Sequence, residues 1–384
     1  MLTCQRALFS LPEGLHYLNC AARAPLLKSA EFVGIAGLQR QRVPDSSLFD
    51  EAYVRLTEGL RMQLGQLINA PADAIAFSPA ASYGLAIAAH NVPLRRGQNV
   101  VLPDGDFPSD VYAWSNRCAA VGAELRLVPC PPGAERPASA WSERLQEAID
   151  RNSAVVNLST LNWSDGLRFD LAAIGARARE VGAWFVVDGS QTIGAAPFDF
   201  AALQPDLVVC VGHKWLLGPY QFGFVAVGER LREASPFEEA WGNRAGSENG
   251  AGSAYFTDYR PGARRFDVGE HGNPVSLPML DAGVRQVAGW SAPAIQAYCA
   301  QLNRRLDALC RAERAWMAPA SQRYEHIVGL RLPPGAELPR IVAGLRARNL
   351  LVSQRRTSLR VSPHVYNSPE DMDALCDALT ALLA

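Results

Sequence analysis

Seven short runs of apolar residues recur between residues 74 and 227, and most are rich in Val, Ile, Leu or Phe. They span residues 74–77, 99–102, 125–128, 154–158, 184–187, 207–211 and 222–227. Continuous apolar runs of this length are typical of strands that are buried on both faces. Stretches with helical spacing separate them, at residues 82–90, 109–121, 141–149 and 170–181. This alternation predicts an α/β fold with a mostly parallel seven-stranded sheet flanked by helices.

The pattern changes after the last of these runs. Residues 233–262 are rich in Gly, Glu, Ser and Asn, which predicts a loop. The elements expected beyond it are helices at 277–290, 292–314 and 337–348, an apolar segment at 325–332, a strand pair at 350–353 and 358–361, and a helix from Pro369. We therefore expect three parts: an N-terminal arm (1–20) on the small domain, a large α/β domain (21–262), and a smaller α+β domain with the interdomain helix (263–384).

Charge and composition exclude several classes of protein. The formal net charge is −1, and no acidic or basic block would attract a nucleic acid or an anionic membrane. No apolar run approaches the roughly 20 residues that span a bilayer, and the first ten residues do not resemble a signal peptide, so we expect a cytoplasmic location. The eight cysteines form neither a C-x-x-C motif nor a Cys/His cluster, so no metal site is predicted.

Lysine is rare in this chain, which makes its two occurrences informative. Of the 37 basic residues only Lys28 and Lys214 are lysines. Lys28 is expected to be exposed near the start of a helix. Lys214 follows a buried strand, at the sheet edge where open α/β folds bind ligands. Other polar or aromatic side chains also follow apolar runs, namely Asp188, Gln191, Phe107, Asn162 and His213.

Asp188 and Lys214 end neighbouring apolar runs and would meet across a crevice. Pyridoxal phosphate (PLP) chemistry needs such a pair: a lysine to form the imine, and an acid to keep the pyridine nitrogen protonated. Apolar surroundings and a neighbouring cation would favour the neutral amine of Lys214. A surface salt bridge is the alternative interpretation.

The cofactor phosphate needs N–H donors at a helix N-terminus. The segment FSPAAS, residues 77–82, ends a strand and opens a helix, with a hydroxyl at Ser82. Ser82 is equally suited to be a plain N-cap. His213 could reach the same phosphate or could be a buried histidine with its own partner.

Three strings together resemble the class V aminotransferases, a family of PLP-dependent transferase fold type I. They are DGSQ (188–191), GHKWLLGP (212–219) and SPAAS (78–82). Cysteine desulfurases, kynureninases and isopenicillin N epimerase-like enzymes belong to this family. The resemblance implies that Lys214 holds PLP as an imine, that Asp188 pairs with the pyridine nitrogen and that Gln191 bonds the ring hydroxyl. It further implies that Ser82, the Ala81 backbone and His213 hold the phosphate.

The resemblance also extends to the substrate side. DFPSDVYAW (106–114) resembles the kynureninase and epimerase-like branch, which implies that Phe107 stacks on the cofactor ring; a core Phe is the alternative. Arg360 matches the arginine that binds the substrate carboxylate, with a structural ion pair as the alternative. Asn162 matches an asparagine near the ring hydroxyl and the substrate carboxylate. YLNCAARAP (17–25) resembles a substrate-side loop, which makes Ala22 and Arg23 wall residues.

Three departures limit this resemblance. Val211 occupies the position of a serine that often binds the phosphate in this family. The segment GEHGNP (269–274) corresponds to the stretch that in many relatives reaches the cofactor phosphate of the partner subunit, with Asn273 as the expected donor. We therefore expect a homodimer with shared active sites. The third departure is the segment VSQRRTSLR (352–360), which contains no cysteine, whereas the desulfurases carry a nucleophilic cysteine on a loop before the carboxylate-binding arginine. Cys20 lies in the substrate-side loop, and we expect it to be buried and inert.

The leading hypothesis is a PLP enzyme that acts at Cα of a small amino acid. Transamination, epimerisation, elimination and C–S cleavage remain open, with an epimerase-like or lyase-like enzyme favoured. A C–S lyase or desulfurase-like enzyme without the loop cysteine is one alternative. A dinucleotide-dependent dehydrogenase would need a G-x-G-x-x-G turn, which the chain lacks. A non-catalytic PLP-binding protein would have no need of Asp188, Lys214 and Arg360 together.

Overall fold

A seven-stranded sheet forms the centre of the protein. The computed structural model describes residues 2–43, 51–133, 137–247 and 255–384. The strands are β2 (Ile75–Ser78), β3 (Asn99–Pro103), β4 (Glu124–Val128), β5 (Ser153–Ser159), β6 (Trp184–Asp188), β7 (Leu207–Val211) and β8 (Gly223–Val227). Their order is β2-β8-β7-β6-β5-β3-β4, and only β8 runs antiparallel to its neighbours. The prediction of a mostly parallel seven-stranded α/β fold is confirmed.

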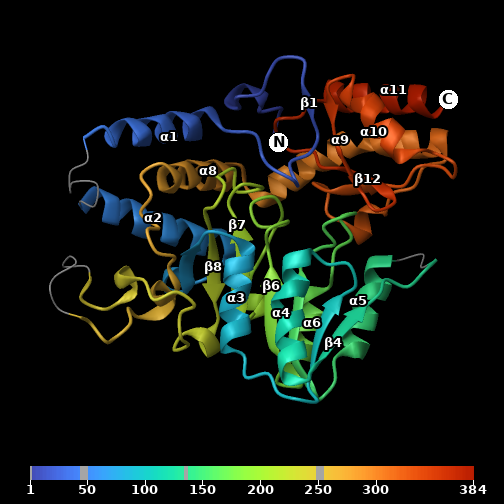
Figure 1. The fold of residues 1–384 in the computed structure, drawn as a ribbon. Coiled ribbons are helices and arrows are strands. Elements are labelled where there is room, and N and C mark those ends of the chain that lie inside the picture. The colour runs from blue at the N-terminus through green and yellow to red at the C-terminus, as the bar shows by residue number, and fades with distance from the viewer. Residues whose placement is uncertain (1, 44–50, 134–136, 248–254) are drawn as a thin grey trace.

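Helices cover both faces of this sheet (Figure 1). One face packs against α3 (Ala81–Asn91) and α4 (Pro108–Val121). The other packs against α2 (Glu51–Ile68), α5 (Pro137–Ala148), α6 (Leu171–Glu180) and α7 (Phe200–Leu203). Side chains alternate between the two cores along each strand, so that Val186 and Val209 face α3 and α4 whereas Val187 and Val208 face the opposite side.

One strand departs from the expectation that all seven are buried on both faces. β4 lies at the edge of the sheet, where Leu127 is 39% exposed and Leu125 is half-buried. β4 has only one neighbouring strand and its apolar run is not fully covered, whereas β2, at the opposite edge, is buried throughout. The apolar pattern alone does not distinguish this edge strand from a central one.

The remaining elements lie beyond the carboxyl ends of the parallel strands (Figure 1). They are α1 (Lys28–Arg40), α8 (Ser276–Trp290), α9 (Ala292–Glu313), α10 (Leu338–Arg346), α11 (Pro369–Leu383), and the antiparallel sheet of β11 (Ser353–Arg355), β12 (Ser358–Val361) and β9 (Val328–Leu330). Short 3-10 helices span Arg6–Leu8, Ala72–Ala74, Glu229–Leu231, Trp241–Asn243, Gly262–Phe266 and Ala320–Gln322. Lys28 is exposed at the start of α1, as predicted. In the described part of the chain, no helix has the length and apolarity that crossing a membrane requires.

The predicted strand pair 350–353 with 358–361 divides in the structure. β10 (Leu350–Leu351) pairs in parallel with β1 (His16–Tyr17) of the N-terminal arm, whereas β11 pairs with β12. Of the predicted strand 350–353, only Ser353 therefore pairs with the predicted partner. The pairing of β1 with β10 depends on a contact between the two ends of the chain, which local pattern does not show.

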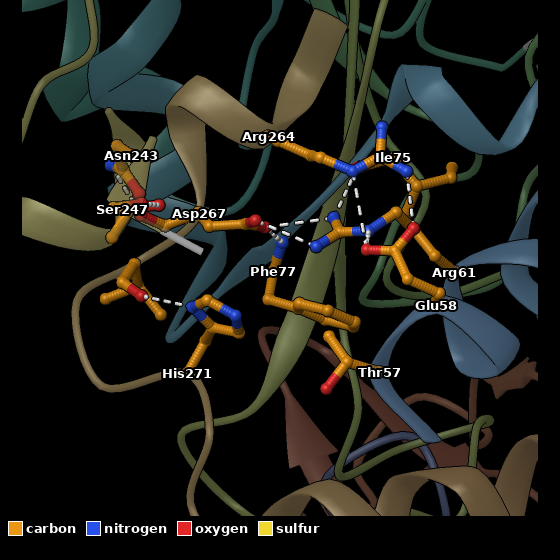
Figure 2. A network of polar contacts seen from close by, with 12 residues as sticks. Thr57, Glu58, Arg61, Ile75, Phe77, Asn243, Ser247, Arg264, Asp267 and His271 are labelled. Atoms are coloured by element: carbon orange, nitrogen blue, oxygen red, sulfur yellow. Dashed lines mark hydrogen bonds and ion pairs between the residues drawn. The ribbon is translucent and has the colours of Figure 1, made fainter. Parts of the chain in front are cut away.

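A buried ion pair ties α2 to the strand that leads into the predicted phosphate loop (Figure 2). Arg61 donates to both carboxylate oxygens of Asp267, at 3.0 and 2.8 Å, and to the carbonyl of Ile75 at 2.6 Å. Asp267 also accepts from the backbone N–H of Phe77 at 2.8 Å. Burial alone would raise the pKa of Asp267, but Arg61 lowers it overall, so the pair is charged. This network anchors the end of β2 just before residues 78–82.

Candidate active site

Asp188 and Lys214 lie at the ends of adjacent parallel strands. Asp188 is the last residue of β6 and stands opposite Val209 of β7, and Lys214 follows three residues after β7. The turn between the end of β7 and Lys214 needs a glycine at position 212, because a Cβ at Gly212 would lie 2.2 Å from the carbonyl oxygen of Phe222. The tertiary structure thus brings together the carboxylate and the amine that the sequence pattern singles out.

The electrostatic surroundings of Lys214 favour its neutral form. Lys214 is half-buried. Burial lowers the pKa of its ammonium group, Asp188 opposes that shift and Arg360 adds to it. Asp188 is buried and accepts a hydrogen bond from the backbone N–H of Ser190 at 2.7 Å. An amine with a lowered pKa is suited to imine formation and to proton transfer.

A second carboxyl group accompanies Asp188 and was not predicted. Asp110, in the first turn of α4, is 0% exposed. Its Oδ1 accepts from Asn157 Nδ2 at 2.9 Å, and its Oδ2 has no hydrogen-bond partner among the described residues. Burial raises the pKa of Asp110 well above the usual range, and the charges of Asp188 and Asp106 raise it further. These surroundings favour the protonated form of the Asp110 carboxyl.

Asp106 completes this group of carboxyls. It accepts from the backbone N–H and the hydroxyl of Ser159, at 2.9 and 2.6 Å. Burial is the main cause that raises the pKa of Asp106 to about 6. The string DFPSD contains both acids, four positions apart, and the second lies in the first turn of a helix, where an acid is favoured. This pattern could have pointed to Asp106 and Asp110. Only the fold shows that they approach Asp188.

The start of α3 carries the residues predicted to hold the phosphate, and that role stays a prediction. The N-cap of this helix is Ala80 and its side chain makes no capping bond, so the interpretation of Ser82 as an N-cap is wrong. The hydroxyl of Ser82 is exposed, and backbone N–H groups in the first turn, including that of Ala81, lack intrahelical partners. Gly84 lets α3 approach the sheet, since a Cβ there would lie 2.6 Å from both Val209 Cγ1 and Val225 Cγ1.

His213 lies half-buried beside Lys214, and its ring stacks on Tyr220 with centroids 4.0 Å apart. Burial, followed by the charges of Lys214 and Arg23, lowers the pKa of His213 to about 4. The imidazole is therefore neutral at physiological pH. It can offer a hydrogen bond to a phosphate but no positive charge, and its phosphate role stays a prediction.

Three further predicted cofactor residues surround the same crevice. The Phe107 ring is half-buried, with its centroid 5.5 Å from Lys214 Nζ, and meets Trp163 edge-on at 5.7 Å. The amide of Gln191 accepts from Trp215 Nε1 at 2.9 Å and donates to the carbonyl of Ala21 at 3.1 Å. Buried Asn162 accepts from the backbone N–H of Ser164 at 2.9 Å through its Oδ1. Their roles toward the ring stay predictions.

Arg360 is buried without a carboxylate partner. It is 1% exposed, and its Nη1 donates to the carbonyl of Trp163 at 2.9 Å. Its Nε and Nη2 have no hydrogen-bond partner among the described residues. Burial lowers the pKa of Arg360 to about 9, and the charge of Arg355 contributes. The alternative of a structural ion pair has no support in the described chain, because no acid there pairs with Arg360. A buried guanidinium without a carboxylate partner leaves N–H groups that a water or an anionic ligand can accept.

The N-terminal loop closes the crevice from the side of the small sheet. Ala21 N donates to Ser362 Oγ at 3.1 Å and Ala24 N to the carbonyl of His213 at 2.9 Å. Ala22 is half-buried, and the exposed guanidinium of Arg23 lies 4.3 Å from the Tyr220 ring centroid. Cys20 is fully buried, and burial raises the pKa of its thiol to about 12, so it provides no thiolate at neutral pH.

Asn273 is exposed at the start of α8. Its Oδ1 accepts from the backbone N–H groups of Val275 and Ser276, each at 2.9 Å. This caps the helix and leaves the amide NH₂ group as the donor. A contact with a partner subunit's phosphate stays a prediction.

Comparisons with known proteins identify the family. The model of the family "Aminotransferase class-V" matches residues 43–261, which is more than half of the chain. The chain therefore belongs to the class V aminotransferases, a family of PLP-dependent enzymes, and the predictions of family and cofactor are confirmed.

Individual relatives differ in how much of the chain they match. A probable cysteine desulfurase of Methanothermobacter thermautotrophicus is 31% identical over 47% of this chain and 43% of its own length. The matched region thus spans about half the length of this relative. Isopenicillin N epimerase of Streptomyces clavuligerus is 26% identical over 95% of this chain and 94% of its own.

Solved structures share the fold at low sequence identity. A mutant of C-DES with glycine linked to its PLP cofactor is 21% identical with a TM-score of 0.88, covering 99% of both chains. A cysteine desulfurase from Thermococcus onnurineus is 18% identical with a TM-score of 0.84, covering 100% of this chain and 99% of its own. These likenesses bear on the fold alone.

The described residues fit the cofactor. The carboxyl groups of Asp188 and Asp110 act electrostatically on the half-buried Lys214, Asp110 Oδ2 has no partner among the described residues, and first-turn N–H groups of α3 lack intrahelical partners. This donor set matches a group with a cationic ring nitrogen at one end and a phosphate at the other.

Proposed function

We propose that this protein is a PLP-dependent enzyme in which Lys214 transfers a proton at Cα of a small α-amino acid whose carboxylate is bound by Arg360. The observation that carries the proposal is the buried Arg360, whose Nε and Nη2 lack partners among the described residues. A protein that only stored the cofactor would have no use for this buried, unpaired cation.

The residues of the site divide the work. PLP, when bound, supplies an electron sink that acidifies the Cα–H bond. Lys214, with its lowered pKa, accepts and returns the proton. Asp188 keeps the positive charge of the ring nitrogen in place, and Arg360 orients the substrate through a bidentate carboxylate contact. The N-terminal loop, bonded to Ser362 and His213, limits access of water.

An epimerase-like or lyase-like outcome is favoured over sulfur transfer to the enzyme. The match to isopenicillin N epimerase extends over 95% of this chain, whereas a probable cysteine desulfurase and a cysteine desulfurase match over 47% and 67% of it. Residues 352–360 contain no cysteine, and Cys20 is a buried thiol with a pKa of about 12. No described cysteine is therefore placed to receive sulfur from a substrate.

Exchange of the Cα proton tests this function directly. Purified protein with PLP should show the visible absorption band of lysine-bound cofactor, and amino acids in D₂O should acquire deuterium at Cα. Lys214→Ala should abolish both the exchange and borohydride trapping of the cofactor. Arg360→Gln should keep the visible band but need about 100-fold more amino acid for the same exchange rate, the effect of removing one partner of a buried charged contact.

Two outcomes would contradict the proposal. A colourless protein that ignores added PLP would refute the cofactor's place on Lys214. A yellow protein that exchanges no amino acid in a broad screen would instead indicate non-catalytic PLP binding. Released keto acid, ammonia or sulfide, and inversion at Cα, would separate transaminase, lyase and epimerase outcomes in the same screen.

A further inference from the structure

A second arginine lies on the same face of the small sheet as Arg360. In the register of β11 and β12, Ser353 stands opposite Arg360, and Arg355 stands opposite Ser358. Residues two apart along a strand share a face, so Arg355 and Arg360 are diagonal neighbours across the pair. The opposite face carries Leu359 and Val361, which are fully buried in the core of the small sheet and its helices.

Both guanidinium groups face one indole ring. The Arg355 and Arg360 Cζ atoms lie 5.4 and 5.9 Å from the centroid of Trp163. Trp163 is held in turn by a hydrogen bond from Nε1 to the carbonyl of Gly105 at 3.1 Å and by its edge-on contact with Phe107. The pair of arginines therefore borders the crevice at Lys214, on the side of the predicted ring-stacking residue.

Neither arginine has an acidic partner in the described part of the chain. Arg355 donates to the carbonyl of Gln354 at 2.8 Å, and its buried Nε has no partner there. Apart from Arg360, the buried arginines of the described chain are Arg61, Arg265 and Arg323, and each contacts a carboxylate; Arg355 itself is half-buried. Two like charges placed side by side without a counter-ion are costly, and the lowered pKa of Arg360 reflects burial first and Arg355 next.

We propose that Arg355 forms a second anion-binding position beside Arg360, so that the substrate is an α-amino acid whose side chain carries a second carboxylate. This inference rests on the proposed function, in which the α-carboxylate occupies Arg360. One carboxylate neutralises one guanidinium. The charge of Arg355 then remains for an anionic group on the side chain, and its planar fork suits a carboxylate.

Matched pairs of amino acids test the second position. The holoprotein is titrated with aspartate and asparagine, glutamate and glutamine, and 2-aminoadipate and norleucine, while the visible band of the cofactor is recorded. We expect one acidic member or more to bind about 10- to 100-fold more tightly than its neutral analogue, the contribution of a charge-assisted hydrogen bond. Arg355→Gln should remove this preference and leave binding of the neutral members unchanged.

Arg356→Gln is the matched control. Arg356 follows Arg355 in the same turn but is exposed, and its guanidinium packs against Gly105. This variant removes the same charge from the turn and should keep the preference for acidic side chains. Equal affinity of the wild type for acids and neutral analogues would overturn the proposal. So would an Arg355→Gln variant that weakens both members of a pair equally, because that result indicates a structural role.

Thermal stability measured with simple carboxylates, in the absence of amino acids, separates the second anion position at Arg355 from the proposed function. Glutarate should raise the melting temperature of the holoprotein more than butyrate does at equal concentration, because only the dicarboxylate engages both arginines. Arg355→Gln should make the two shifts equal. If no amino acid perturbs the cofactor band while glutarate still depends on Arg355, the proposed function fails and the second anion position stands. If glutarate and butyrate shift the wild type equally, the second position is refuted.

Discussion

At the scale of single residues, the raised pKa of Asp110 makes the stability of the fold depend on pH. Its pKa is raised in the folded protein, chiefly by burial, whereas in the unfolded chain the carboxyl ionises near a pKa of about 3.9. A group of this kind contributes its full stability below the unfolded pKa and loses it as pH rises toward the folded pKa. Asp110 therefore makes the folded protein less stable at neutral pH than in mild acid.

Asp110→Asn should remove this pH dependence. The asparagine oxygen can still accept from Asn157, and its uncharged NH₂ group would take the place of the unpaired Oδ2. We expect the free energy of unfolding of the variant to fall less than that of the wild type between about pH 4 and pH 8. Urea denaturation across this range measures the difference. Parallel pH profiles of the two proteins would show that Asp110 is ionised in the fold.

At the scale of elements, the position of α3 decides where the N–H groups of its first turn lie, which are the donors predicted for the phosphate. This helix rests directly on β7 and β8 because Gly84 has no Cβ. The close approach brings the free N–H groups at Ala81 and Ser82 to the edge of the sheet where Lys214 lies. A small residue in the second turn of the helix thus determines where an anion can bind at its start.

Gly84→Ala should move the helix away from the sheet. The added methyl would lie 2.6 Å from Val209 Cγ1 and Val225 Cγ1, so we expect a loss of about 1–3 kcal/mol in the free energy of unfolding, typical of an overpacked core. The affinity for PLP, measured by fluorescence titration, should fall as well. Gly59→Ala in α2 is the control, because nothing lies within 4 Å of its Cβ. This control should instead stabilise the protein by about 0.5–1 kcal/mol.

At the scale of the whole molecule, α1 presents apolar side chains on its outer face. Phe32, Ile35 and Leu38 are 74%, 49% and 60% exposed, at a helical spacing that places them on one side. The inner face packs on α8, where a Cβ at Gly37 would lie 2.1 Å from the carbonyl oxygen of Pro274. An exposed apolar row of this kind is typical of an interface.

We expect the apolar face of α1 to contact a second copy of the chain in the predicted homodimer. Combined Phe32→Glu and Leu38→Glu should convert a dimer into monomers in analytical ultracentrifugation, because the charges would be buried in the interface. Ala120→Glu, at an exposed position of α4, is the control and should leave the dimer intact. If the unmodified protein sediments as a monomer, the homodimer and the shared phosphate site through Asn273 are both wrong.

Much of the fold and part of the site could be predicted from the sequence. All seven central strands appear within one or two residues of their apolar runs, because a strand buried in a parallel sheet must be apolar over its whole length. Asp188 and Lys214 were found because strand ends in such a sheet converge on one edge. The edge position of β4 and the division of residues 350–355 between two partners were missed, because both depend on contacts between distant segments.

The sequence by itself determined the sheet, the cofactor chemistry and the residue types of the crevice, because apolar periodicity and strand-end chemistry are local properties of the chain. The tertiary structure decided which charges meet. It placed the unpaired carboxyl of Asp110 behind Asp188, and it set Arg355 beside Arg360 over Trp163. Those pairings arise from strand register and from helix packing between segments far apart in the chain, and burial then shifts the pKa of each group.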